Sequence, residues 1–229
     1  MDSEIVYLTG YHGTELNRGN RMLDAKEMEL SSGDKHWLGD GSYFFKDDFY
    51  AFKWIKDMYK HRYKKEYSTP CELFENYSII LANLGVNKDR IFDMTNNPRH
   101  KIVFDSVFQN CKNKKEYSER FRDNDMAEGV VLNIMFKEMD YIQKYDLVIA
   151  TFTRRRGNYK NLNLRLDFMP ETQYCVKNIE IVVPLELFDC INRVEEFEQL
   201  IQKLNFKSDN NNFLYNKDKK FTNRKKFKM

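Results

Sequence analysis

Short runs of β-prone residues alternate with helical segments along this chain of 229 residues. They do not follow the regular strand–helix–strand order that builds a parallel sheet, so the pattern favours an α+β fold. Hydrophobic residues make up 41% of the chain and aromatic residues 15%, which is enough to fill a core. A wholly disordered chain is therefore excluded.

The expected strands are apolar runs bounded by glycine or polar residues. They cover residues 5–8 ending at Gly10, 42–45, 77–84, 90–93 and 147–152, and two pieces within 174–183 that break at residues 177–178. The expected helices cover residues 14–26, 48–63, 98–110, 126–141 and 197–204. Thr14 is the expected cap of the first helix. In the second helix, Phe52, Ile55 and Tyr59 form one apolar stripe.

The chain is expected to fold as one domain over residues 1–206, followed by a basic, flexible tail over residues 207–229. Within the domain, residues 112–125 are highly charged and predict a linker or an exposed helix. The stretch 216–229 holds six Lys, one Arg and one Asp, a net charge of +6, so the rest of the chain carries −3 of the total of +3. Such a tail can contact RNA, DNA or an acidic protein, or can be a solvated terminus.

The cysteines show no spacing typical of a zinc site, and the histidines at 36, 61 and 100 show no metal-ligand spacing. We therefore expect free thiols and no bound metal. The first residues show no signal-peptide pattern, and no apolar run approaches the roughly 20 residues of a membrane helix. These features predict a cytoplasmic protein with no membrane partner.

Three short stretches that lie far apart in the chain carry residues suited to binding a nucleotide. Residues 11–14 read Y-H-G-T, residues 38–45 read L-G-D-G-S-Y-F-F, and residues 173–176 read Q-Y-C-V. An imidazole can hydrogen-bond a ribose hydroxyl, and a glycine lets a ligand approach the backbone closely. Aromatic rings can stack on a flat cationic ring such as a pyridinium.

In this order, the three stretches resemble the ADP-ribosyltransferases of the diphtheria-toxin and poly-ADP-ribose-polymerase class. The signature of that class is a His, a Tyr and a third residue, usually Glu. The resemblance implies a split antiparallel β-sheet core with peripheral helices around a cleft for NAD, which is the substrate. Residues 79–93 and 147–152 also resemble segments of small bacterial toxin members of the class. The implied setting is therefore a toxin–antitoxin or anti-phage defence system, with an antitoxin as a candidate partner.

The resemblance implies a role for each matching residue. His12 and Gly13, with Thr14, would hold NAD. Tyr43 would stack on the nicotinamide ring, and Trp54, eleven residues later, would close the other face.

Gln173 stands where most members of the class have the catalytic glutamate. A glutamine can hydrogen-bond the ribose hydroxyl but supplies no negative charge. Members without Glu at this position are generally mono-transferases, so the resemblance implies mono-ADP-ribosylation. Glu171 lies two residues earlier, on the same face of the expected strand, and could supply the charge or orient the acceptor, although Pro170 directly precedes it.

The basic run Arg154, Arg155 and Arg156, together with the basic tail, favours a nucleic-acid acceptor, RNA or DNA, over a protein acceptor. Arg18 and Arg21 could reach the pyrophosphate from the helix that follows His12. Two alternatives stay open. One is a catalytically inactive member that binds NAD, ADP-ribose or nucleic acid, and the other is an unrelated RNA-cleaving toxin that uses His12 in acid–base catalysis.

Overall fold

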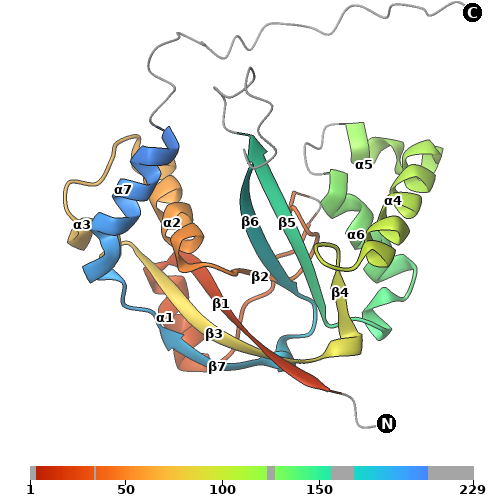
Figure 1. Ribbon diagram of the computed structural model, residues 1–229, viewed down its shortest axis with the longest axis horizontal. Helices are drawn as coiled ribbons and strands as arrows, with labels where there is room; N and C mark the ends of the chain where they lie inside the picture. The colour runs from red at the N-terminus through yellow and green to blue at the C-terminus, as the bar shows by residue number, and fades with distance from the viewer. Residues whose placement is uncertain (1–3, 34, 123–126, 156–167, 206–229) are drawn as a thin grey trace, which may run out of the picture.

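The computed structural model describes residues 4–33, 35–122, 127–155 and 168–205 (Figure 1). Within these residues the chain adopts an α+β fold, as the sequence predicts. The strands are β1 (Ile5–Glu15), β2 (Ser42–Phe45), β3 (Tyr77–Asn87), β4 (Ile91–Asp93), β5 (Leu147–Arg155), β6 (Phe168–Val176) and β7 (Val182–Leu187). The α-helices are α1 (Leu16–Ala25), α2 (Asp48–Tyr63), α3 (Pro70–Phe74), α4 (Pro98–Asn113), α5 (Ser118–Arg122), α6 (Ala127–Glu138) and α7 (Val194–Asn205).

The strands form one seven-stranded sheet with the order β4-β5-β6-β2-β1-β3-β7. Strands β4 and β5 are parallel, and the other neighbours are antiparallel. Strands β1 and β2 share only the pair Tyr11 and Phe45, whereas β1 pairs with β3 along its whole length. The sheet is therefore mixed and continuous, but its two halves meet at a narrow seam. In Figure 1 the β5–β6 half stands upright and β1 and β3 run diagonally below it.

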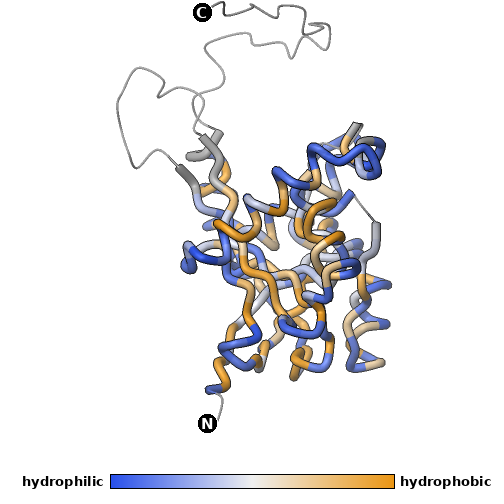
Figure 2. The backbone as a smooth tube through the Cα atoms, turned by 90° about the vertical axis from the view of Figure 1, so that its right-hand side faces the viewer, coloured by the Kyte–Doolittle hydropathy of each residue, from blue (hydrophilic) through white to orange (hydrophobic). Residues whose placement is uncertain are grey.

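The core consists of three clusters of buried hydrophobic residues. The first packs α4 and α6 against β4 and β5, the second packs α1 against the centre of the sheet, and the third packs α2 and α7 against β3. Helix α6 is buried at every position from Gly129 to Phe136, so it is a central helix rather than an amphipathic surface helix. Figure 2 shows hydrophobic residues concentrated in the central strands and helices and hydrophilic residues at many outer turns.

The first strand is longer than the sequence predicts. We expected it to end near Gly10 and Thr14 to cap the next helix, but β1 continues to Glu15, which is the N-cap residue of α1 and makes no side-chain capping bond. The longer strand depends on tertiary structure, because β3 supplies hydrogen-bond partners for β1 as far as the pair Glu15 and Tyr77. The Y-H-G-T motif therefore lies inside a strand and not at its end.

Pro170 does not interrupt the strand that carries the third motif. Strand β2 pairs with β6 only from Gln173 to Val176, so at Pro170 strand β6 has β5 alone as a neighbour. A proline is tolerated at such an edge because no ladder bond requires its missing N–H.

The other expectations for the chain have mixed outcomes. The stripe of Phe52, Ile55 and Tyr59 is confirmed, since all three side chains are fully buried under α2. In the charged segment 112–125, the first two residues end α4, residues 115–117 form a 3-10 turn and residues 118–122 form α5. Residues 156–167, which include Arg156, and the tail 207–229 lie outside the described residues.

Candidate functional site

The three predicted motifs meet in one cleft of about 320 Å³, within the usual range of ligand pockets, about 300–1,000 Å³. Antiparallel pairing brings them together, because β2 lies between β1 and β6 and places Phe45 opposite both Tyr11 and Gln173. The lining includes all seven residues that the sequence proposes for catalysis and for holding NAD: His12, Gly13, Thr14, Tyr43, Trp54, Glu171 and Gln173.

His12 lines the cleft, and its ring carries a buried hydrogen-bond acceptor. Its Nδ1 lies 2.6 Å from the carbonyl oxygen of Tyr43, which can only accept, so Nδ1 carries the hydrogen. Burial lowers the pKa of His12 to about 4, and the ring is therefore neutral near pH 7. Its Nε2 is buried and has no hydrogen-bond partner among the described residues. A ligand hydroxyl can donate to this atom and remove the cost of leaving it unsatisfied.

Lowering the pH from about 7 to about 5 is expected to reduce the free energy of unfolding by about 2 kcal/mol through His12 alone. Its pKa is about 4 in the folded chain and about 6.5 when exposed, so between these values the unfolded state binds a proton that the folded state does not. The contribution of His12 to the free energy of unfolding is complete above about pH 6.5 and is lost as the pH falls toward 4. Urea unfolding of the wild type and His12→Gln at both pH values measures the difference. An equal pH dependence in both proteins contradicts the assignment.

Gly13 has a structural role that the sequence did not reveal. A Cβ atom there would lie 2.8 Å from Cγ2 of Ile55, 2.9 Å from the carbonyl oxygen of Ala51 and 3.2 Å from Trp54. The missing side chain therefore lets α2 pack directly on β1 and places Trp54 at the cleft. Thr14 is buried and lines the same wall.

Tyr43 offers its ring, and not its hydroxyl, to the cleft. The hydroxyl donates to the carbonyl oxygen of Gly39 and accepts a hydrogen bond of 3.0 Å from the backbone N–H of Leu38. The His36 ring lies beside it, with 5.9 Å between the ring centroids. Burial raises the pKa of the Tyr43 hydroxyl well above its ordinary value. Tyr43 is thus suited to stacking and not to proton transfer.

Trp54 is 49% exposed, and its ring centroid lies 6.4 Å from that of Phe45 in the cleft. It also lines a wider hollow of about 660 Å³, which shares only Trp54 and Met58 with the cleft. Since no other predicted residue reaches this hollow, we assign the site to the smaller cleft.

Glu171 and Gln173 form a hydrogen-bonded pair on the cleft wall. Nε2 of Gln173 donates to Oε1 of Glu171 over 2.7 Å, and the two residues are only 4% and 9% exposed. This confirms that positions i and i+2 of the strand share a face. A carboxylate therefore lies in the cleft beside Gln173.

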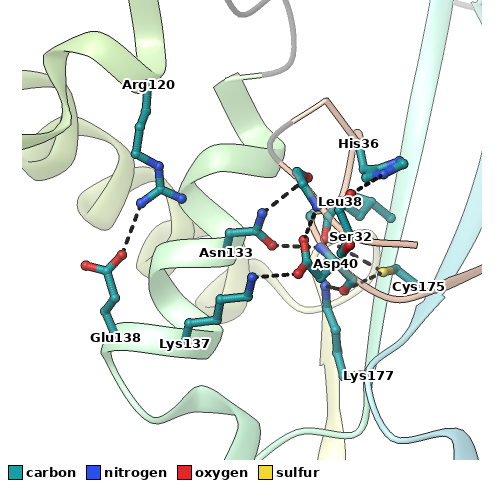
Figure 3. Close-up of polar contacts among 12 residues, drawn as sticks. Ser32, His36, Leu38, Asp40, Arg120, Asn133, Lys137, Glu138, Cys175 and Lys177 are labelled. Carbon is teal, nitrogen blue, oxygen red and sulfur yellow. Dashed lines mark hydrogen bonds and ion pairs between the residues drawn. The ribbon is translucent and has the colours of Figure 1, made fainter. Parts of the chain in front are cut away.

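The loop between α1 and β2 covers one side of the cleft and is held by α6. Oδ1 of Asn133 accepts a hydrogen bond of 2.7 Å from the backbone N–H of Asp40, and Lys137 forms an ion pair of 2.6 Å with the Asp40 carboxylate (Figure 3). Gly39 has a φ of 72°, and a Cβ there would lie 2.4 Å from Asn133. Gly39 therefore permits the close contact between this loop and α6. Gly41 instead permits close contact with β6, since a Cβ there would lie 2.6 Å from the sulfur of Cys175.

Sequence reasoning missed four residues of this covering loop that line the cleft: Ser31, Lys35, His36 and Trp37. A cation and two rings in succession, directly before the second motif, were a signal that could have identified the last three.

Of the two arginines proposed for the pyrophosphate, the structure places only one in the cleft. Arg18 lines the cleft and donates to Glu29 over 2.7 Å, whereas Arg21 contacts the same Glu29 at 3.2 Å but does not line the cleft. Arg154 and Arg155 lie at the end of β5, beyond Phe152.

No group of three or more His, Cys, Asp or Glu side chains that could hold a metal occurs in the part of the chain that the structure describes. Among the same residues, no helix is long and apolar enough to cross a membrane.

The chain is 36% identical over 206 residues to the uncharacterized protein MJ0359 of Methanocaldococcus jannaschii, and the alignment covers 84% of this chain and 92% of that protein. This chain belongs to the same family as MJ0359. No model of a known protein family matches the chain, and no solved structure matches it.

Proposed function

We propose that the protein is an NAD-dependent mono-ADP-ribosyltransferase with an ADP-ribosyltransferase-like core. The observation that carries the proposal is the convergence of His12, Tyr43 and the Glu171–Gln173 pair on one cleft, from three strands that are distant in sequence. The narrow seam between β1 and β2 supports the split-sheet core that the resemblance implies.

The cleft supplies the groups that this reaction needs. The bond between ribose C1′ and the nicotinamide nitrogen breaks, and its electron pair leaves with nicotinamide. The sugar develops oxocarbenium character, which a nearby carboxylate stabilises, and Glu171 is the carboxylate that lines the cleft. A nucleophilic oxygen or nitrogen of the acceptor then bonds to C1′ and loses its proton.

The other residues bind and orient the substrate. Nε2 of His12 accepts a hydrogen bond from a ribose hydroxyl, because it is buried, unprotonated and without a partner among the described residues. The rings of Tyr43 and Trp54 enclose the space for the flat nicotinamide. Arg18 is the cleft cation closest in sequence to His12 and suits the pyrophosphate.

The acceptor in this proposal is a macromolecule, with RNA or DNA favoured over protein because of the basic run at 154–156 and the basic tail. The resemblance to small toxin members extends the proposal to a cytoplasmic toxin or anti-phage protein that an antitoxin would neutralise. A second candidate is a catalytically inactive binding protein, which the glutamine at position 173 favours.

Incubation of the protein with labelled NAD and separate pools of RNA, single-stranded DNA and cell protein separates these functions. Label transfer that is lost in His12→Ala and in Tyr43→Ala supports the transferase. NAD binding without transfer supports the inactive binding protein, and RNA shortening without NAD indicates an unrelated nuclease. Tyr7→Ala is a matched control, because this ring is 76% exposed and lies outside the cleft.

Gln173→Ala is expected to lower the transfer rate at least about tenfold, or roughly 1.4 kcal/mol. The change removes the amide that lines the cleft and donates a hydrogen bond to Glu171. Rates measured with the best acceptor pool test this expectation. An unchanged rate would remove Gln173 from the site.

A further inference from the structure

The cleft contains a second aromatic surface that the proposed NAD contacts do not use. Trp37 of the covering loop lines the cleft, is 37% exposed, and packs edge-on against Phe152 of β5 with 4.8 Å between ring centroids and 75° between ring planes. The flat nicotinamide needs one aromatic slot. In the proposed function, the rings of Tyr43 and Trp54 already form that slot. The exposed part of the Trp37 ring is therefore available to another planar group.

This second surface lies beside the carboxylate. Phe152 is the cross-strand partner of Glu171 in the β5–β6 ladder, and directly opposed residues in a sheet lie on the same face. Phe152 thus lies next to both Trp37 and Glu171, and these two residues line the cleft. If Glu171 stabilises the charge on the sugar, C1′ lies near Glu171. An acceptor that attacks C1′ then has to approach close to Trp37 and Phe152.

The charges around the surface favour a polyanion. Lys35 also lines the cleft, is exposed, and forms no ion pair with any described residue. In the sequence, the basic run 154–156 follows shortly after Phe152. An exposed indole near a lysine that forms no ion pair with any described residue suits single-stranded nucleic acid, in which bases stack on rings and phosphates contact basic side chains.

We propose that Trp37 is the acceptor-binding residue on which an unpaired base of a single-stranded polynucleotide stacks, while Lys35 contacts a flanking phosphate. This inference rests on the proposed function and gives it a substrate class. A duplex does not fit, because its bases are stacked on one another and do not expose a face to the indole.

The test measures binding of labelled single-stranded DNA and RNA oligonucleotides by fluorescence anisotropy, without NAD, on the full chain. Trp37→Ala is expected to weaken binding about tenfold, and Trp37→Phe to recover most of it, since a smaller ring still stacks. Tyr7→Ala, an exposed ring outside the cleft, should bind like the wild type. The difference in affinity between the two oligonucleotides shows whether the surface prefers DNA or RNA.

A second measurement tests the phosphate contact. Lys35→Gln is expected to reduce the slope of log affinity against log salt by about 0.7, the value for one phosphate of a single strand. Lys101→Gln makes the same change in net charge on the outer side of α4, where Lys101 pairs with Asp105, and should leave the slope unchanged.

Affinity for ADP-ribose separates this inference from the proposed function. Trp37→Ala should bind ADP-ribose like the wild type. If ADP-ribose binding falls tenfold instead, Trp37 holds the adenine of the dinucleotide and the inference is overturned. Equal binding of duplex and single strands, or oligonucleotide binding unaffected by Trp37→Ala, also overturns it. If the wild type binds oligonucleotide through Trp37 but neither binds nor cleaves NAD, the proposed function fails and the nucleic-acid surface stands.

Discussion

Glu171→Gln is expected to lower the turnover rate of ADP-ribose transfer about a hundredfold and to change the affinity for NAD by less than about threefold. Removal of one preorganised electrostatic group from an active site typically costs about 2.7–4 kcal/mol of transition-state stabilisation. The ground state loses little, because the charge on the sugar develops only as the glycosidic bond breaks. Initial rates with labelled NAD over a range of concentrations give kcat and KM separately.

The design of this experiment depends on the pairing of Glu171 with Gln173. Glutamine has nearly the shape of glutamate, so Glu171→Gln removes charge without leaving a cavity. The double variant Glu171→Gln/Gln173→Glu moves the carboxylate two residues along the same strand face and should recover part of the rate. Glu186→Gln, an exposed change on β7, is the matched control. A single Glu171→Gln variant that transfers at the wild-type rate would show that another group stabilises the sugar.

Gly129→Ala is expected to destabilise the fold by about 3 kcal/mol or more, the upper range for forcing an extra group into a packed interior. A Cβ at this position would lie 1.7 Å from the carbonyl oxygen of His36, which is backbone and cannot rotate away. Helix propensity alone predicts the opposite sign, since alanine favours a helix over glycine by about 1 kcal/mol. Urea unfolding near pH 7 measures the change.

The same substitution should also impair the site. Relief of the clash requires the covering loop to move away from α6, which carries Lys35 and Trp37 away from the cleft. Glu128→Ala, at the exposed neighbouring position of the same helix, should change stability by less than about 0.5 kcal/mol. Wild-type stability in Gly129→Ala would mean that the loop does not pack against α6 in solution.

Much of the secondary structure follows from local sequence. Helix α2 begins at Asp48 and ends at Tyr63, as expected, because its apolar stripe has helical spacing and faces the core. Strand β2 covers the expected residues 42–45 because glycines with positive φ precede it and force a turn there. Such features depend on residues that are close in sequence, so they form whatever the distant parts of the chain contribute.

Strand β1 and Pro170 show where local reasoning fails. No nearby residue indicates that β1 extends past Gly10, since the extension depends on pairing with β3, some seventy residues away. Likewise, a proline is acceptable in β6 only because β2 stops short of it.

For the candidate site, the sequence by itself determined which residue types are present, and its motifs around His12, Tyr43 and Gln173 resemble those of one enzyme class. Only the tertiary structure decided that these residues line one cleft and that Lys35 and Trp37 line it too. It also decided that Gln173 donates a hydrogen bond to Glu171 and that Gly13 serves the packing of α2. The physical reason is that strand pairing and helix packing set distances between residues far apart in the chain, whereas residue type sets only the chemistry that each can perform.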